Sequence, residues 1–305
     1  RFIHNPNDRF LYTELTDTMR KLKSLFQTLL SKDRTVKQKM NWIFTHIECF
    51  RYKSRVNWIK TIYFNLRSLP FKDAKKLPVY IYSNTELRDL SGHVEIIGEI
   101  TRGMIRIGQY MYRSYAKTRI YNRGTIKLGK GVLILRGCEL AVFEKGYLEL
   151  NPFVFLGENS SVYVYNKIII GEHTYITYHS QLFDTDFHYT VNTETGEIRN
   201  RTSSIILGKY NWVGNKTTIK KGTVTPDNTI VAAPNSMLNK DYRQKIPECS
   251  IIGGSPAKLL VSGHRRVFNI DTEIMLNRHF ATTDRPYCFD MHHGNIDDFC
   301  VKNKA

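Results

Sequence analysis

The chain has 305 residues, of which 41% are hydrophobic and 24% are charged, and its formal net charge is +17. This composition is typical of a folded globular protein and excludes disordered and collagen-like chains. The charge is uneven, because residues 1–80 hold 17 Lys and Arg against 6 Asp and Glu, so we expect an anionic partner or surface for that part.

The cysteines and the apolar runs indicate the cellular compartment of the protein. The five cysteines are odd in number and form no Cys-x-x-Cys pair, which argues against a disulfide framework and against a zinc cluster. No apolar run approaches the roughly 20 residues that span a bilayer. No signal peptide precedes the polar start, although a chain that begins with Arg1 can lack upstream residues. We therefore predict a cytoplasmic protein.

Residues 10–66 show helical periodicity. Apolar residues form three stripes, namely Leu11, Leu15, Leu22, Phe26 and Leu29; Met40, Ile43, Phe44 and Ile47; and Val56, Ile59, Tyr63 and Leu66. The pattern predicts three short amphipathic helices that end near Pro70 and Pro78, where LPVYIY begins an extended segment. We assign residues 1–80 to a basic α-helical N-terminal region.

From about residue 90 short β-branched and aromatic runs alternate with glycine, which predicts many short strands. Apolar or β-branched residues recur every six positions, in Leu207, Val213, Ile219, Thr225, Val231 and Met237, in Val164, Ile170, Ile176 and Leu182, in Leu150, Leu156, Val162 and Ile168, and more loosely in Leu128, Ile134 and Leu140. A period of six favours a parallel β-solenoid whose repeated residue points inward. An irregular β-sandwich is the alternative.

The six-residue step stops at Leu182 and resumes at Leu207. Residues 183–205 are therefore predicted to form an excursion loop, with TETGEI (193–198) as its hairpin tip. The segment DTDFH places Asp184, Asp186 and His188 where this loop leaves the scaffold. Loops held by a rigid scaffold often carry function.

Three segments resemble the hexapeptide-repeat acyltransferases, especially the group that O-acetylates sugars and polysaccharides. They are ILGKYNWVGNKTTIKKGTVTPDNTIVAAPNSML (206–238), IIGGSPAKLL (251–260) and ITYHSQLFDTDFH (176–188). The resemblance covers roughly residues 90–262 and implies a mainly β fold, a left-handed parallel β-helix over residues 81–262, followed by a tail over 263–305. It also implies a homotrimer with each active site in a cleft between neighbouring subunits, a carbohydrate acceptor, and acetyl-CoA along the C-terminal coils.

Acetyl transfer from a thioester to a hydroxyl needs a base for the hydroxyl proton and a donor for the oxyanion. The resemblance implies a histidine on the excursion loop as the base, which here is His188. Histidine titrates near neutrality. Either Asp184 or Asp186 is predicted to fix the tautomer of His188 and to stabilise its imidazolium.

For CoA, the resemblance points to Trp212, Gly214 and Asn215 near the thioester and to Ser255, Pro256, Ala257 and Lys258 near the pantetheine and nucleotide. Lys258, with Lys220 and Lys221 as helpers, offers cations to the phosphates. The backbone N–H of Gly214 is our candidate for stabilising the oxyanion.

His179 and Tyr178 are predicted to line the acceptor pocket, although Thr177 and Tyr178 stand where relatives more often carry Ser and Trp. A metal site built from His179, Asp184, Asp186 and His188 is the alternative for this cluster. The γ-class carbonic anhydrases, which share the β-helix and end in a similar PAK motif, bind zinc through three histidines, and their spacing is not matched here. We expect no metal.

The basic N-terminal helices have two interpretations. The favoured one is a cap over the open end of the solenoid. The other is an interfacial surface with Trp42, Trp58 and Phe64 beside basic residues, which would bring the protein to anionic lipid at the inner face of the membrane. No nucleic-acid signature accompanies the charge, so no nucleic-acid partner is expected. In the tail, TEIMLNRHF is predicted to form a short helix.

The sequence therefore predicts an acetyl-CoA-dependent O-acetyltransferase acting on a sugar hydroxyl in a surface polysaccharide or its precursor. One alternative transfers acetyl to the amine of an amino-sugar nucleotide. The other is a non-enzymatic β-helix scaffold without affinity for CoA.

Overall fold

The structure is a computed structural model that describes residue 35 and residues 55–111, 114–232 and 234–301. The chain divides into two compact units, Arg1–Lys53 and Ser54–Ala305. The first two predicted helices lie outside the described residues. Residues 54–80, which the sequence groups with the N-terminal region, belong to the same unit as the strands.

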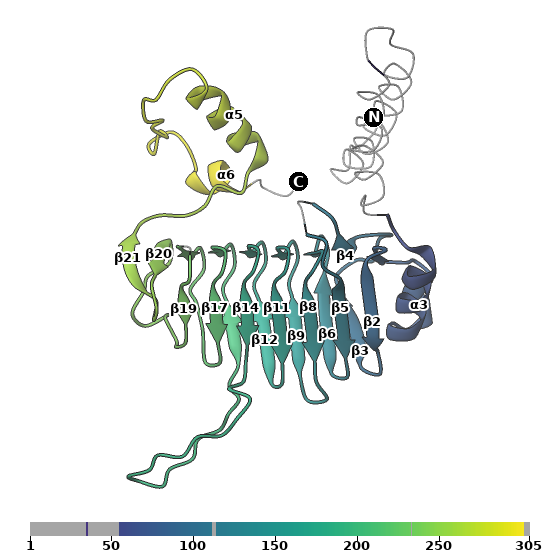
Figure 1. Cartoon of the computed structure of the whole chain (residues 1–305). Coiled ribbons are helices and arrows are strands. Elements are labelled where there is room, and N and C mark those ends of the chain that lie inside the picture. Colours follow the sequence, from purple (N-terminus) through teal and green to yellow (C-terminus); the bar gives the residue numbers. More distant parts are fainter. Residues whose placement is uncertain (1–34, 36–54, 112–113, 233, 302–305) are drawn as a thin grey trace. The chain divides into compact units, whose positions relative to one another are not determined.

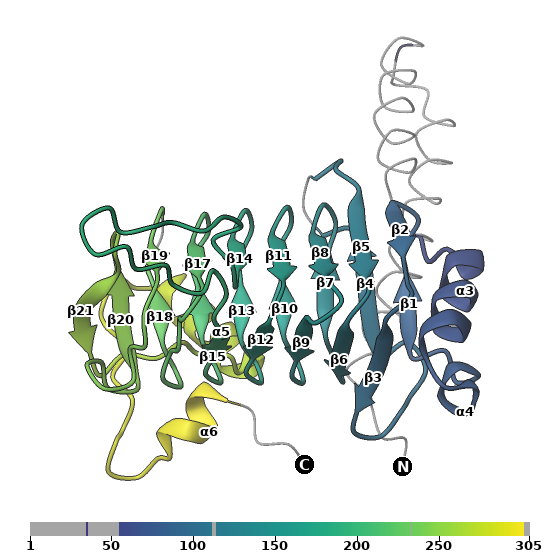
Figure 2. The same cartoon turned by 90° about the horizontal axis from the view of Figure 1, so that it is seen from below.

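The described strands form three sheets (Figures 1 and 2). The nine-stranded sheet contains β1 (Val79–Ile81), β4 (Ile105–Gln109), β7 (Leu133–Leu135), β10 (Phe155–Leu156), β13 (Tyr175–Ile176), β16 (Trp212–Val213), β18 (Ile230–Val231), β20 (Ser250–Gly253) and β21 (Lys258–Ser262). The seven-stranded sheet contains β2 (Thr85–Asp89), β5 (Thr118–Asn122), β8 (Glu139–Val142), β11 (Ser161–Val164), β14 (Gln181–Phe183), β17 (Thr218–Lys220) and β19 (Met237–Leu238). The five-stranded sheet contains β3 (His93–Ile97), β6 (Thr125–Gly129), β9 (Tyr147–Leu150), β12 (Lys167–Ile170) and β15 (Ile205–Leu207).

From β1 to β17 the chain visits the three sheets in turn, and each circuit pairs in parallel with the one before. Phe155 pairs with Tyr175, 20 residues later, and Val213 pairs with Val231, 18 residues later. A circuit of 18 residues is three steps of six, one step for each sheet. The predicted period thus corresponds to the passage from one sheet to the next.

The repeated residues form the core. Leu150, Leu156, Val162 and Ile168 are fully buried, as are Val164, Ile170, Ile176 and Leu182. The residues that follow Val231 deviate from the six-residue step, because Leu238 is buried while Met237 is only partly buried. The step there is seven residues long, so the predicted inward position of Met237 is wrong.

The third predicted helix is α3 (Trp58–Ser68), followed by the short α4 (Phe71–Ala74). Its buried face differs from the predicted stripe, because Ile59, Tyr63 and Leu66 are exposed. Thr61 and Asn65 are buried instead, against the backbone of β1. β1 is the edge strand of its sheet, and its backbone groups need polar partners more than apolar ones.

Between β14 and β15 the chain leaves the sheets in a long loop, which projects from the body of the molecule in Figure 1. An antiparallel bridge joins Val191 to Ile198 across its tip. The side chain of Asn192 accepts the N–H groups of Glu194 and Thr195 there. The loop thus ends in a tight turn at the predicted tip.

The C-terminal part begins where β21 pairs antiparallel with β20. It continues into α5 (Ile270–Phe280), which contains the predicted TEIMLNRHF helix, and α6 (Ile296–Cys300). No helix among the described residues combines the length and the apolar character needed to cross a membrane.

Candidate active site

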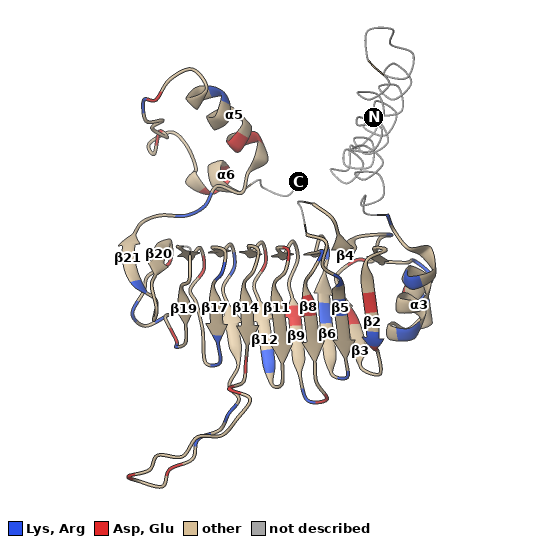
Figure 3. Cartoon of the chain, in the orientation of Figure 1, with Lys and Arg blue, Asp and Glu red and all other residues tan. Residues whose placement is uncertain are grey.

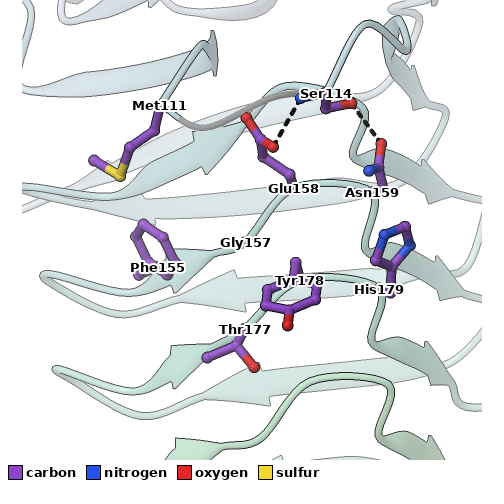
Figure 4. Close-up of a pocket in the computed structure, with 9 residues that line it drawn as sticks. All are labelled: Met111, Ser114, Phe155, Gly157, Glu158, Asn159, Thr177, Tyr178 and His179. Carbon is purple, nitrogen blue, oxygen red and sulfur yellow. Dashed lines mark hydrogen bonds between the residues drawn. The ribbon is translucent and has the colours of Figure 1, made fainter.

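An open pocket of about 910 Å³ lies beside the turns that follow β10 and β13 (Figure 4). Its lining comes from three segments far apart in the chain: Met111 and Ser114 from the β4–β5 connection, Phe155 with Gly157 to Asn159, and Thr177 to His179. Apolar and polar groups therefore meet in a space large enough for a small ligand.

Two hydrogen bonds hold the β4–β5 connection against the turn after β10. The backbone N–H of Ser114 donates to Oε2 of Glu158 at 3.0 Å, and Oγ of Ser114 donates to Oδ1 of Asn159 at 2.7 Å. The Glu158 side chain is buried. Because a bond to a buried carboxylate is stronger than a neutral one, this wall of the pocket is well supported. Neither Ser114 nor Glu158 was predicted from the sequence, since each has the pattern of an ordinary turn residue.

The predicted acceptor residues both line this pocket. Tyr178 and His179 are exposed, and their rings meet edge to face with centroids 5.6 Å apart. His179 has a positive φ of 59°, and its N–H donates to the carbonyl of Glu158 at 2.9 Å. The backbone thus directs an imidazole and a phenol toward the same space. Their role in binding stays a prediction.

The turn of Gly214, Asn215 and Lys216 stacks directly on the turn that carries Tyr178. The N–H of Lys216 donates to the carbonyl of Tyr178 at 3.1 Å. The N–H of Gly214, however, donates to the carbonyl of Val231 at 3.0 Å as part of the parallel ladder. Gly214 is therefore not available as the oxyanion donor, and that expectation is wrong.

Trp212 lies on β16 with part of its ring exposed, and Arg266 from the C-terminal part lies over it. The guanidinium carbon of Arg266 is also 4.7 Å from the ring centroid of Tyr175 and 4.6 Å from that of Phe268. Arg266 is a second cation near the predicted CoA path. It lies beyond the six-residue repeat, so no pattern in the sequence pointed to it.

The other predicted CoA residues form the turn between β20 and β21. Ser255, Pro256 and Lys258 are exposed, whereas Ala257 is buried and its N–H donates to the carbonyl of Met237 at 2.8 Å. Two strand spacings separate β16 from β20 in the same sheet, which is about 10 Å. The fold thus brings Trp212 and this turn onto one sheet.

His188 lines a different pocket, of about 490 Å³, at the base of the excursion loop. Its other lining residues are Phe183, Thr185, Asp186, Phe187, Thr190 and Lys220. His188 is exposed, and its backbone N–H donates to the carbonyl of Asp186 at 2.7 Å. Within one chain the predicted base and the predicted acceptor residues therefore lie in separate pockets. Lys220 is placed with His188 and not with the sheet that carries Trp212.

The two aspartates beside His188 have other partners. Asp184 is fully buried, and its two carboxylate oxygens accept the N–H groups of Tyr165 and Asn166 at 2.8 Å each. Burial nevertheless raises the pKa of Asp184. Among the described residues no hydrogen bond joins either aspartate side chain to the His188 ring, so their predicted role as its partner stays a prediction.

Asp186 forms ion pairs with Lys221, whose Nζ is 2.7 Å from Oδ2, and with Lys220, whose Nζ is 3.4 Å from Oδ1. Partial burial acts to raise the pKa of Asp186, but the two lysines outweigh it and the pKa is lowered. Lys220 and Lys221 thus hold the loop base, and their role as helpers for the CoA phosphates stays a prediction. In the described part of the chain no cluster of three or more His, Cys, Asp or Glu is arranged to hold a metal ion.

No protein-family model matches the chain. It is similar to the putative lipopolysaccharide biosynthesis O-acetyl transferase WbbJ of Escherichia coli K12, with 26% identity over 149 residues, or 46% of this chain and 74% of WbbJ. The probable acetyltransferase Rv3034c of Mycobacterium tuberculosis is 25% identical over 52% of this chain and 56% of its own length. The putative colanic acid biosynthesis acetyltransferase WcaF of Escherichia coli K12 is 24% identical over 44% of this chain and 68% of WcaF.

Solved structures with partial likeness include a variant of AntD, an N-acyltransferase from Bacillus cereus, in complex with dTDP and coenzyme A. It has a TM-score of 0.38 and 16% identity, over 70% of this chain and 98% of AntD. The polysialic acid O-acetyltransferase OatWY has a TM-score of 0.33 and 21% identity, over 66% of this chain and 83% of OatWY.

Proposed function

We propose that this chain, an acyltransferase whose predicted resemblance is confirmed by its acetyltransferase relatives, transfers acetyl from acetyl-CoA to a sugar hydroxyl. WbbJ and WcaF are both described by name as acetyltransferases of polysaccharide biosynthesis, which supports a surface polysaccharide or its precursor as the acceptor. No metal takes part in the proposed reaction.

One observation carries the proposal. The turn with Tyr178, predicted to meet the acceptor, is hydrogen-bonded to the turn with Asn215, predicted to meet CoA, through the 3.1 Å bond from Lys216. A transferase needs its two substrates side by side. The turn of the predicted acceptor residues and the turn of the predicted CoA residues thus lie next to each other.

The proposed assembly is a homotrimer of left-handed parallel β-helices. The three parallel sheets, visited in turn, support a helical winding of the chain. The separation of His188 from the pocket of Tyr178 and His179 supports active sites shared between subunits, because an excursion loop that projects from one subunit can reach a pocket on the next.

In the proposed reaction His188 removes the proton of the sugar hydroxyl while the hydroxyl oxygen attacks the thioester carbonyl carbon. A tetrahedral oxyanion forms and collapses, the carbon–sulfur bond breaks, and the imidazolium returns its proton to the CoA sulfur. The products are the acetyl ester and free CoA. Histidine suits both steps because it changes charge near neutral pH.

Calorimetric titration of the full chain with acetyl-CoA tests the cofactor. Saturable binding is expected, and its absence would leave the scaffold alternative. An acceptor screen with acetyl-CoA then compares neutral oligosaccharides with amino-sugar nucleotides. Ester formation supports the proposal, whereas amide formation on an amino-sugar nucleotide contradicts O-acetylation.

A further inference from the structure

Helix α3 is inverted relative to an ordinary surface helix, because its polar side chains face the protein. Nδ2 of Asn65 donates to the carbonyl of Val79 at 2.7 Å, and Oδ1 of Asn65 accepts the N–H of Val79 at 3.2 Å. Oγ1 of Thr61 accepts the N–H of Ile81 at 3.0 Å. The helix therefore docks onto the edge of β1 through these hydrogen bonds and buries Phe64, and its other apolar residues remain on the exposed side.

The opposite side carries a group of exposed apolar residues, which we call the α3 face. Ile59 is 83% exposed and Phe71, at the start of α4, is 74% exposed. The remaining members are Trp58, Ile62, Tyr63 and Leu66, all exposed. Single exposed apolar residues are ordinary, but a contiguous group at one end of a molecule indicates an interaction site.

Basic residues occur on α3 and in the segments beside it (Figure 3). Between residues 55 and 76 the sequence holds six Lys and Arg and one acid, Asp73. The exposed ones are Arg55, Arg67, Lys72, Lys75 and Lys76. Lys60 differs, since its ammonium donates to the carbonyls of Ser83 and Thr85. Arg102 adds a further cation, 5.5 Å from the ring centroid of Trp58.

The combination of positive charge and apolar area on the α3 face distinguishes between the partners that could cover it. A second copy would bring two cationic surfaces together. An anionic bilayer instead accepts the apolar side chains at the boundary of its acyl chains and pairs its phosphates with the flanking cations. Trp and Tyr are the aromatic residues that favour this depth.

We propose that the α3 face binds the surface of an anionic lipid bilayer, with Ile59, Leu66 and Phe71 inserted and Arg67, Lys72 and Lys75 at the headgroups. The residue set differs from that expected from the sequence, because Phe64 is buried against β1 and takes no part. The proposal is independent of the transferase activity, and it places the enzyme beside acceptors carried in a membrane.

Vesicle sedimentation with the full chain tests it. We expect binding to vesicles of phosphatidylcholine with phosphatidylglycerol, and little binding to phosphatidylcholine alone. Ile59→Gln with Leu66→Gln should weaken the partition at least tenfold, since two inserted aliphatic chains are lost. Lys72→Gln with Lys75→Gln should weaken it about fivefold for each lysine, and high salt should mimic that change.

Matched controls use exposed residues elsewhere. Ile198→Gln with Leu260→Gln removes another exposed isoleucine and leucine, 62% and 60% exposed, and Lys130→Gln with Lys209→Gln removes two exposed lysines. Both controls should partition like wild type. Equal binding to neutral vesicles, or unchanged binding of the Ile59/Leu66 variant, overturns the proposal. So does a fall in oligomeric state of that variant by light scattering, because a second copy would then cover the face. The Ile59/Leu66 variant should bind acetyl-CoA with the affinity of wild type.

Discussion

Arg266 lies over the ring of Trp212, with its guanidinium carbon 5.1 Å from the ring centroid, although 54 positions separate the two residues. Trp212 belongs to the predicted CoA site and Arg266 to the C-terminal part that no repeat covers. The contact places Arg266 beside the predicted CoA site. We therefore predict that Arg266 contributes to CoA binding, a role that the sequence did not reveal.

Arg266→Met should weaken acetyl-CoA binding about tenfold, because a cation beside the predicted CoA path attracts the anionic cofactor and its contact with the aromatic rings holds Trp212 in place. Calorimetry on both proteins measures the change. Arg243→Met is the control, since Arg243 is paired with Asp241 and should be neutral for CoA. Equal affinities of wild type and Arg266→Met would remove Arg266 from the site.

Asp184→Ala should lower the free energy of unfolding by about 2–4 kcal/mol, since two backbone N–H groups that the carboxylate accepts would lose their partner. Asp184→Asn, which keeps one acceptor oxygen, should lose less. Chemical denaturation measures both. If Asp184→Ala keeps its stability but loses kcat, the residue acts on His188 rather than on the base of the loop.

His188→Ala should reduce kcat by about 10²–10⁴-fold, the usual contribution of a general base, while the Kd for acetyl-CoA stays unchanged. His179→Ala should instead raise the acceptor KM. Steady-state kinetics with varied acceptor separates the two effects. Wild-type kcat in a folded His188→Ala protein would exclude it as the base.

Mixing two impaired variants tests whether sites are shared between subunits. His188→Ala supplies an intact pocket, and a Tyr178→Ala/His179→Ala double variant supplies an intact loop. After refolding an equal mixture, about a quarter of the sites in a random trimer should combine loop and pocket correctly. Activity that stays at the low level of the separate variants would place base and acceptor in the same subunit.

Lys221→Met should raise the pKa of Asp186, because Lys221 makes the shorter of its two ion pairs. A carboxyl whose pKa is lowered on folding contributes stability above its unfolded value, and this contribution is lost as pH falls through the folded value. The variant should therefore lose less stability than wild type below about pH 4. Carboxyl NMR titration measures the pKa of Asp186, with Lys216→Met as the control. An unchanged titration would show that Lys220 alone sets the pKa.

The repeated core was predictable because it is a local signal. Successive inward residues, such as Ile176 and Leu182, lie on successive sheets. The six-residue period is therefore visible in the sequence without any knowledge of the tertiary contacts. The extra residue before Leu238 is visible only once burial is known. The inverted face of α3 was not predictable, since Ile59 and Leu66 have the spacing of a buried stripe and the demand of β1 for polar partners is a tertiary fact.

The candidate site likewise has one part that the sequence predicted and one part that it did not. His179 and Tyr178 were identified from one contiguous motif, and they share a pocket. Ser114 and Glu158 meet only because the β4–β5 connection crosses two circuits, and a single sequence carries no signal for such a contact. The partners of Asp184 were missed for the same reason, because Tyr165 and Asn166 lie in the preceding circuit.

Asn65 has a consequence for how the molecule can grow. A stack of near-identical parallel strands has no inherent limit, since every outer strand is a template for another one, from its own chain or from a neighbour. At β1 the amide of Asn65 occupies the backbone groups of Val79 that an added strand would use, and at the other end β21 reverses direction. In the nine-stranded sheet these two edges, and not the number of circuits, determine where strand addition stops. Duplication of an internal circuit would therefore lengthen this sheet and leave both of its edges closed.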